Sequence, residues 1–419
     1  DYDAVMAQGN NFLEWARHLT GNARKERLEL ARERFAALLA RYGYRNEILF
    51  RMMLYLVRND QPAEVADLRS YLEADPEFEP DPDVYAELGG YLLDEGDVEE
   101  ARTVLMKAAA RSTTVPEIDY HLARLYREIA EPAEEGKALR NALVTLGEAE
   151  RTPERILMRI DALRRHGDWM YREARYLDAR VEYDTAIAEI EAEQQAGTLG
   201  RMALLGLAYE GRGNIPYYVE GDYDAALGLY ERARWNGVAD PALDYRVGYI
   251  RYARGDYAGA VRELVPVQEA LPQNPNALFA LATALHQHRE YFAAEGFYRR
   301  LLDRLLDRRN EIAELRPEVN PEHLELMNLL VRTHNNLGVT YYRQGQARGT
   351  IRRDVTRALV QITEAAQYLD QLSRDPETLA RSDARNLAYL NANGIQHPSA
   401  RFDPTIYDRL PKDIEADRF

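Results

Sequence analysis

The sequence predicts an all-α fold, a right-handed α-solenoid of helical hairpins that follow one another at a fixed spacing. The stretch from Tyr217 to Leu302 repeats one pattern: small or aromatic residues, a Gly-Asp-Tyr turn or a degenerate version of it, then an alanine with a bulky residue four positions later. The repeated alanines, Ala226, Ala260 and Ala294, are 34 residues apart. No stretch sustains the alternation of polar and apolar residues that is typical of β-strands.

Composition and charge exclude several classes of function. The 419 residues carry a net charge of −16, which argues against a surface that follows nucleic-acid phosphates. There is no cysteine, so disulfides, zinc–thiolate sites and thiol catalysis are excluded. No apolar run reaches the length of a membrane-spanning helix. We therefore expect other proteins as partners, with no nucleic acid and no direct membrane span.

The first residues, DYDAVMAQGN, contain neither an initiator methionine nor a signal peptide. Such a start is expected of a processed or trimmed chain, so a targeting segment is missing rather than shown to be absent. The lack of cysteine suits the cytoplasm as well as a bacterial periplasm. The residues alone leave both locations open.

Divergent hairpins are expected over residues 1–78. Apolar residues at helical spacing on both sides of a turn at Gly21 predict the first hairpin, with Trp15 and Phe35 packing across it. A similar apolar pattern over residues 47–72, interrupted by a polar turn, predicts the second.

Residues 79–374 are predicted to form a continuous array with long-helix insertions. Small residues recur at the same spacing in its early part, where Ala123 lies 34 residues after Gly89. An Asp or Asn before a proline marks a helix start, because the first residue caps the helix and proline at the first helical position loses no hydrogen bond. Such joints are Asp81-Pro82, Asp240-Pro241, Asn274-Pro275, Asn320-Pro321 and Asp375-Pro376.

Two kinds of insertion are expected in the array. Long charged runs over residues 187–210 and 301–318 predict that two second helices extend beyond the usual length. An arginine-rich insertion is predicted as an exposed loop between the helices of the last unit, and contact with an acidic partner or a phosphate is the alternative. Its arginines are Arg348, Arg352, Arg353 and Arg357.

Residues 375–419 are expected to form a C-terminal helix and an extended tail. From residue 395 onward the sequence has scattered prolines and little periodicity. The tail carries Phe402, Ile406, Tyr407 and Leu410, and an extended segment of this kind is able to occupy a groove, its own or that of a neighbouring molecule.

Over residues 44–370 the chain resembles the tetratricopeptide repeat (TPR) family. That family places a small residue in the first helix, glycine at the turn, alanine in the second helix and a bulky residue four positions later. The small residues let the helices approach closely, and the bulky ones fill the gap to the next unit. Residues that fit the pattern are Gly248, Gly255, Ala260 and Leu264. Glu135 in place of alanine, and Pro216 inside a first helix, predict distortion of the fourth and sixth units.

The C-terminal third is also similar to TPR proteins of spirochaetes that are associated with the periplasmic flagellar collar. The similar stretches are YFAAEGFYRRLLDRLLDRR, NNLGVTYYRQ and NLAYLNANGIQHPSARFDPTIYDRLPKDI. This resemblance implies a scaffold that assembles with other collar subunits in the periplasm.

The residues predict no catalytic, cofactor or metal site. His286 and His288, two positions apart on a predicted helix, point to different faces and make a poor metal pair. The glycines around Arg212 lack the preceding strand and the third glycine of a dinucleotide-binding loop. The chain is therefore predicted not to be an enzyme and to need no cofactor.

The predicted binding site is the concave groove, which the first helices of TPR hairpins line. Residues on the side of each first helix away from its own partner helix are expected to face this groove. The 28 tyrosines against 9 phenylalanines suit a half-hydrated recognition surface, although many tyrosines are expected to be core residues. The predicted groove residues are Tyr218, Tyr245, Tyr249, Tyr252, Phe279, His286, Asn335, Tyr342 and Arg343.

The leading functional interpretation is a non-catalytic scaffold for protein–protein interaction in a multiprotein assembly, with the flagellar collar as the assembly that the resemblance implies. The alternative is a transient peptide-binding adaptor or co-chaperone that uses the aromatic groove. A clamp for C-terminal carboxylates is not expected, because no lysine lies near the groove. Self-association is left open.

Overall fold

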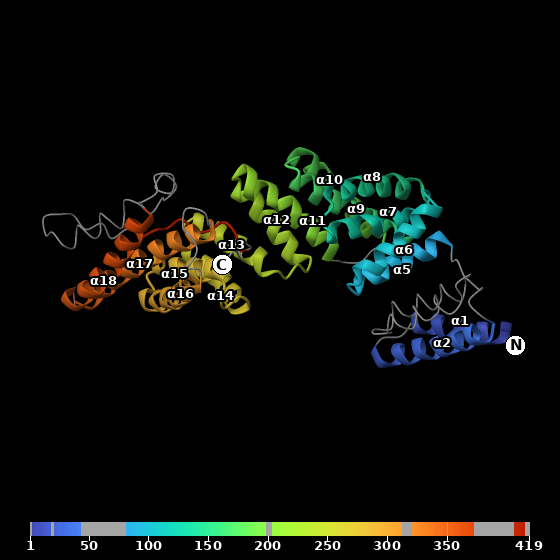
Figure 1. The fold of residues 1–419 in the computed structure, drawn as a ribbon, viewed down its shortest axis with the longest axis horizontal. Coiled ribbons are helices and arrows are strands. Elements are labelled where there is room, and N and C mark those ends of the chain that lie inside the picture. Colours follow the sequence, from blue (N-terminus) through green and yellow to red (C-terminus); the bar gives the residue numbers. More distant parts are fainter. Residues whose placement is uncertain are drawn as a thin grey trace. The chain divides into compact units, whose positions relative to one another are not determined.

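The computed structural model describes residues 2–17, 21–42, 81–197, 203–311, 321–349, 351–372 and 406–414. These ranges contain sixteen α-helices and no strand, which confirms the all-α prediction. The chain divides between Ile215 and Pro216 into two compact units, called unit 1 and unit 2 in chain order. In both units, consecutive helices pair as hairpins of the TPR-like kind (Figure 1).

In its described residues, unit 1 is a series of hairpins in chain order. The hairpins are α1 (Tyr2–Arg17) with α2 (Gly21–Tyr42), α5 (Pro82–Asp94) with α6 (Val98–Arg111), α7 (Pro116–Glu128) with α8 (Pro132–Glu148), and α9 (Pro153–Arg172) with α10 (Tyr176–Gln195), followed by α11 (Ala203–Asn214). From α5 onward, each second helix also packs on the helix that follows it, so the core of the unit runs on from one hairpin to the next.

Unit 2 repeats this arrangement and adds a segment of irregular backbone. Its elements are α12 (Tyr223–Trp235), the hairpins α13 (Pro241–Ala253) with α14 (Tyr257–Ala270), α15 (Pro275–Gln287) with α16 (Tyr291–Glu311), and α17 (Pro321–Arg348) with α18 (Ile351–Leu372), and residues 406–414. A π-helix, η1 (Ile215–Glu220), contains the predicted distortion at Pro216. Proline has no N–H to donate, and the wider π turn is one way for a helix to pass such a residue.

The turns between paired helices share one backbone conformation. Gly96, Gly221 and Gly255 have φ values of 82, 72 and 79°. Each is followed by an aspartate whose side chain caps the next helix. Glycine suits this position because the left-handed region costs other residues about 1–2 kcal/mol. The degenerate turns place Ala130, Ala174 and Arg289 there, with φ values of 56, 57 and 67°.

Small residues allow close helix packing, as the pattern predicts. A Cβ added to Gly89 would lie 2.4 Å from the Leu105 side chain. The ring of Tyr183 fills the space beside Gly167 and Gly211, where an added Cβ would come within 2.9 and 2.5 Å of it. The repeated alanines Ala226, Ala260 and Ala294 are fully buried.

The first hairpin differs from the prediction in one contact. Trp15 does not pack against Phe35: it is 56% exposed, and the guanidinium of Arg27 lies 4.5 Å from its ring centroid. Phe35 is buried against Gly9, where a Cβ would come within 2.5 Å of the ring. Because the missing side chain lets Phe35 fill the space between the helices, Trp15 stays at the surface.

The arginine-rich stretch is not a loop, which corrects the prediction. Helix α17 continues to Arg348 and α18 begins at Ile351. The Arg348 guanidinium lies 3.9 Å from the ring centroid of Phe292, and that of Arg357 lies 3.8 Å from the ring centroid of Tyr341. Cation–π contacts therefore engage both side chains within unit 2. The side chains of the other two arginines lie outside the described residues.

The other expected insertions are met in part. Residues 187–210 are not one helix, because α10 ends at Gln195 and α11 begins at Ala203. Helix α16 reaches Glu311, and the rest of the 301–318 run lies outside the described residues. Three further predictions also lie outside the described residues and stay predictions. They are the hairpin at 47–72, the helix expected after residue 375, and the domain limits near residues 78 and 374. The division at residue 215 falls inside the range predicted as one array.

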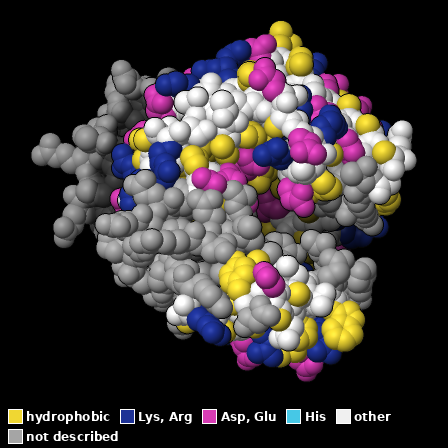
Figure 2. All heavy atoms as spheres, turned by 90° about the vertical axis from the view of Figure 1, so that its right-hand side faces the viewer, with side chains coloured by type: hydrophobic (Ala, Val, Ile, Leu, Met, Phe, Trp, Pro, Cys, Tyr) yellow, Lys and Arg dark blue, Asp and Glu magenta, His cyan; other side chains and the backbone are white. Residues whose placement is uncertain are grey.

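On the face seen in Figure 2, acidic and basic side chains are interspersed rather than gathered by sign. Among the helices that the structure describes, none combines the length and the hydrophobicity needed to cross a bilayer. Within the same part of the chain, no three His, Asp or Glu side chains are grouped to hold a metal ion.

Replacing Ala174 with glycine is expected to stabilise unit 1 by about 1 kcal/mol, because it removes the Cβ from a left-handed turn position. The converse change, Gly96→Ala, is expected to destabilise the same unit by a similar amount. Urea unfolding followed by circular dichroism measures both. A lower stability of the Ala174→Gly variant would contradict the role assigned to this position.

Candidate functional site

The strongest candidate site lies in unit 2, where residues 406–414, called the C-terminal segment, lie against the first helices of successive hairpins. The segment reads IYDRLPKDI and has no regular secondary structure. Its Ile406, Leu410 and Ile414 side chains are only 4, 4 and 5% exposed. The last two belong to the hydrophobic core of unit 2, and Figure 1 shows the C-terminal end of the described chain beside α13 and α15. An aliphatic side chain at every fourth position therefore anchors the segment.

Asn336 of α17 binds the start of the segment with both ends of its side-chain amide. Its Nδ2 donates to the carbonyl oxygen of Tyr407 over 2.9 Å, and its Oδ1 accepts from the N–H of Tyr407 over 2.7 Å. The Asn335 amide supports it by donating to the same Oδ1 over 3.5 Å. An amide that pairs with a backbone N–H and C=O acts as a neighbouring strand would, so it holds the chain whatever side chain the bound residue carries.

At the other end, four consecutive carbonyl oxygens of the segment accept hydrogen bonds from side chains. The donors are Tyr245 Oη to Pro411 (2.7 Å), Tyr217 Oη to Lys412 (2.8 Å), Asn276 Nδ2 to Asp413 (2.9 Å) and Asn274 Nδ2 to Ile414 (3.1 Å). Asn274 is also the cap of α15, because its Oδ1 accepts from the N–H of Ala277 over 2.9 Å. The two ends of one amide thus serve the helix and the segment together.

Tyr218 makes the contact that depends on a side chain of the segment. Its hydroxyl donates to the carboxylate of Asp413 and accepts from Arg246 Nε over 3.1 Å. Burial raises the pKa of Tyr218 against the opposing effect of Arg246, and Asp413 raises it further. The phenol therefore stays protonated and able to donate, which favours an acidic residue at this place.

Tyr218 and Tyr245, both predicted groove residues, bind the segment directly. Tyr249 and Tyr342 are half-buried and pack against the hydrophobic cluster that contains Leu410. The role of these four side chains in binding a partner stays a prediction.

Three other predicted groove residues lie in the packed interior beside the segment. Phe279 is fully buried, with its ring centroid 6.2 Å from that of Tyr298. Tyr252 is 9% exposed and His286 is 5% exposed. The Nδ1 atom of His286 lies 2.8 Å from Thr340 Oγ1.

An open cavity of about 780 Å³ lies at the start of the segment. It is bounded by Ile406 and carries two arginines, Arg289 and Arg343, and none of the described residues that line it is a carboxylate. The Nη1 of Arg343, a predicted groove residue, donates to Gln346 Oε1 over 3.2 Å. The cavity therefore has a basic character at the point where a bound chain enters the groove.

Sequence reasoning missed four residues that hold the segment: Tyr217, Asn274, Asn276 and Asn336. The Asn-Pro pair predicts the capping role of Asn274, but not the hydrogen bond that its Nδ2 donates to Ile414. The available signal was the presence of asparagines on first helices that pack into the unit, since a buried amide needs partners for both of its ends.

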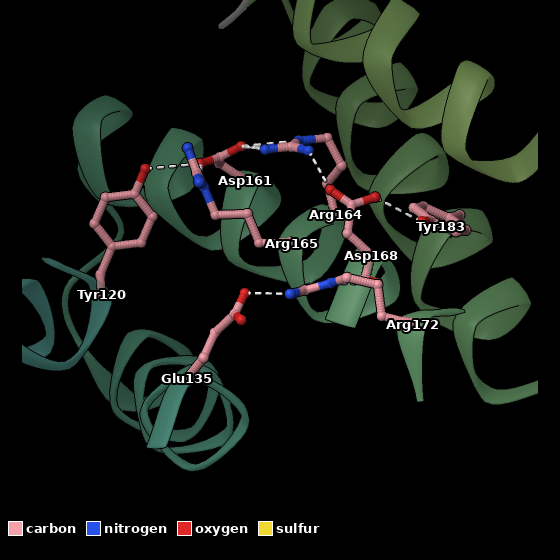
Figure 3. A network of polar contacts seen from close by, with 8 residues as sticks. All are labelled: Tyr120, Glu135, Asp161, Arg164, Arg165, Asp168, Arg172 and Tyr183. Carbon is pink, nitrogen blue, oxygen red and sulfur yellow. Dashed lines mark hydrogen bonds and ion pairs between the residues drawn. The ribbon is translucent and has the colours of Figure 1, made fainter. Parts of the chain in front are cut away.

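Unit 1 carries a second polar cluster, on one face of α9 (Figure 3). Asp161, Arg164, Arg165, Asp168 and Arg172 recur at three- or four-residue spacing and so lie along that face. Arg164 pairs with Asp161 over 2.8 Å and with Asp168 over 2.6 Å. Burial acts to raise the pKa of Asp161, but Arg164 and Arg165 outweigh it and hold that pKa at about 2.

Neighbouring helices complete this cluster. The contacts are Tyr120 Oη donating to Asp161 (2.8 Å), Tyr183 Oη donating to Asp168 (2.6 Å) and Arg172 pairing with Glu135 (2.6 Å). Glu135 thus replaces the usual alanine as the partner of an arginine in the next hairpin. The cluster joins α7, α8, α9 and α10, and we interpret it as structural because its labelled charges are paired within the unit (Figure 3).

Together, the fold and the occupied groove define an all-α protein of TPR-like hairpins that holds an extended segment. No protein-family model matches the chain. No curated protein matches its sequence.

Several solved structures are similar to the chain. The C-terminal part of a TPR repeat-containing protein from Cytophaga hutchinsonii is 17% identical, with 70% of this chain and 98% of that chain covered and a TM-score of 0.45. YrrB, described as a TPR protein with an unusual peptide-binding site, is 17% identical over 52% of this chain and 89% of its own, with a TM-score of 0.36. PilF of Pseudomonas aeruginosa is 15% identical over 73% of this chain and 97% of its own, with a TM-score of 0.31. These likenesses assign no function.

The stability of unit 2 is expected to fall as the pH falls from about 6.5 to about 4. Burial, together with Arg343, lowers the pKa of His286 to about 4. The unfolded chain therefore takes up a proton at a pH where the native one does not, and folding loses up to about 3 kcal/mol over this window. Burial also lowers the pKa of His334, so His286→Gln should remove only part of the slope.

Urea midpoints at about pH 7.5 and about pH 5 measure this effect. The matched control is His288→Gln, because His288 is exposed and lies two residues from His286. Equal pH slopes for the wild type and the His286→Gln variant would contradict the assignment.

Proposed function

We propose that this protein is a non-catalytic scaffold for protein–protein interaction, and that unit 2 binds an extended polypeptide in its groove. The C-terminal segment supports this proposal, because it already lies there as a chain without regular secondary structure. Six hydrogen bonds from unit 2 reach its backbone.

Each type of contact between the groove and the segment contributes differently to recognition. Bonds to the backbone hold any extended chain, buried aliphatic side chains set the register, and the Tyr218–Arg246 pair favours an acidic residue near the end. Ordering a flexible segment offsets most of the gain from these contacts. We therefore expect a dissociation constant of about 1–100 µM for a free peptide.

Within this function, the assembly that we propose is the periplasmic flagellar collar, on the strength of the sequence similarity of the C-terminal third. The groove would then receive a segment of another collar subunit. Purification from the native organism tests the setting: flagellar components at fixed stoichiometry support it, and their absence counts against it.

A transient adaptor or co-chaperone is the second candidate. It is favoured by the number of backbone contacts, because a groove that binds mainly backbone accepts many sequences. Partners that are substoichiometric and lost at moderate salt would favour the adaptor over the scaffold.

The proposal is tested in the full chain with its own segment weakened. Leu410→Asp with Ile414→Asp places charges at buried positions, which should drive the segment out of the groove. A fluorescent peptide with the sequence of residues 403–416 should then bind with the affinity given above, measured by anisotropy. Adding Asn336→Ala should weaken binding about thirtyfold, since two hydrogen bonds of about 1 kcal/mol each are lost.

Asn141→Ala is the matched control, because Asn141 is an exposed asparagine of unit 1. It should leave the affinity unchanged. The peptide-binding role fails if the weakened chain keeps its helices and binds no peptide at about 1 mM. It also fails if weakening the segment melts the helices, because the segment would then be part of the core.

A further inference from the structure

The way in which the C-terminal segment is held makes it replaceable. The groups that donate to its backbone are side-chain hydroxyls and amides of η1, α13, α15 and α17, and such groups bind water when no chain is present. The hairpins that supply them pack on one another through α13 with α14, α14 with α15, α15 with α16, and α16 with α17. The groove is therefore assembled by helix packing that does not pass through the segment.

The segment is also held by few of its side chains. Only three of its side chains are buried, whereas Asp408, Arg409 and Lys412 are exposed. In the sequence, residues 373–405 join it to α18, so it competes for the groove as part of the same chain. A ligand that is covalently joined to its binding site competes at an effective concentration of about 1 mM.

We propose that the C-terminal segment is a built-in competitor, which occupies the groove until an extended segment of another protein displaces it. This inference rests on the peptide-binding function proposed above and adds its regulation. A free ligand must displace the C-terminal segment, so its apparent affinity for the intact chain is lowered. The factor is the effective concentration of the C-terminal segment divided by the dissociation constant of that segment for the groove. For the values given above, this ratio is about 10–1,000.

The geometry also defines the chemistry of the displacing segment. The displacing segment carries aliphatic residues at the spacing of Ile406, Leu410 and Ile414. It carries an acidic residue directly before the last aliphatic one, at the place where the Tyr218 hydroxyl, itself bonded to Arg246, binds Asp413. The first aliphatic position, Ile406, lines the same cavity as Arg289 and Arg343, so residues directly before this position in a displacing segment come near the two arginines. Carboxylates at those places pair with the arginines, so a displacing segment is acidic before its first anchor.

The test cuts the chain between α18 and the segment without removing the segment. A recognition sequence for a site-specific protease is placed within residues 373–405 of the full chain, and the folded protein is cleaved. Binding of the fluorescent 403–416 peptide is then compared before and after cleavage, with circular dichroism to follow the helices. We expect the cleaved chain to bind at least tenfold more tightly than the uncleaved chain, in which the covalently joined segment competes.

The other outcomes distinguish competition by the C-terminal segment from the peptide-binding function on which it rests. Equal binding before and after cleavage overturns the competitor and leaves the peptide-binding function standing. A cleaved chain that keeps its helices and its own segment but never exchanges it for the peptide overturns both. Loss of helices on cleavage shows the segment to be a permanent part of the core. A stable dimer of the uncleaved chain by light scattering identifies a second copy as the occupant and overturns competition within one chain.

A second comparison tests the chemistry of the partner. In the cleaved chain, the peptide with Pro404→Glu and Thr405→Glu should bind at least fivefold more tightly than the peptide with lysines at these positions. Arg343→Ala should reduce this difference, whereas Arg300→Ala, at an exposed arginine of α16, should not. An equal affinity for both peptides overturns the acidic preference alone.

Discussion

The close approach of two helices across a small residue is the contact on which the structure depends. A glycine or alanine on one helix leaves room for a large side chain of the partner helix. Gly89 leaves room for the side chain of Leu105, and Gly167 leaves room for the ring of Tyr183. Each such contact fixes the distance between paired helices, and its repetition aligns the first helices of successive hairpins. The groove of unit 2 follows from this alignment, because its binding groups come from η1, α13, α15 and α17.

The groove combines a packed interior with a polar lining. Asn336 illustrates the balance: it has no exposed surface, yet its amide is satisfied by the Tyr407 backbone and by the hydroxyl of Tyr298, at 3.2 Å. A buried amide without such partners would cost about 1–3 kcal/mol. The polar lining therefore calls for a bound chain or water, which an apolar groove would not. The cluster on α9 in unit 1 solves the same problem differently, since its charges are satisfied by one another.

The regular part of the fold was open to prediction because it depends on neighbours in sequence. The spacing of Ala226, Ala260 and Ala294 and the turn glycines reflect contacts inside one hairpin or between adjacent ones. The exposure of Trp15 was not predictable, because it depends on Phe35 reaching the gap left by Gly9. Pairing of Asn336 with Tyr407 was out of reach for another reason: the partners are 71 residues apart, and the bound atoms belong to the backbone, which every residue shares. The sequence indicates that the tail is able to occupy a groove and names Tyr218 and Tyr245 as groove residues, but it does not indicate the asparagines that hold the backbone of the tail.

The double role of Asn274 restricts how this position can change over evolution. An aspartate would cap α15 equally well, because the helix needs only an acceptor oxygen. It has no hydrogen to give, however, and would turn a carboxylate toward the carbonyl oxygen of Ile414. The substitution of Asn274 by aspartate would thus preserve the helix cap but weaken binding of the segment in the groove. Relatives whose groove no longer binds the C-terminal segment should be recognisable by an aspartate or a serine at the position of Asn274.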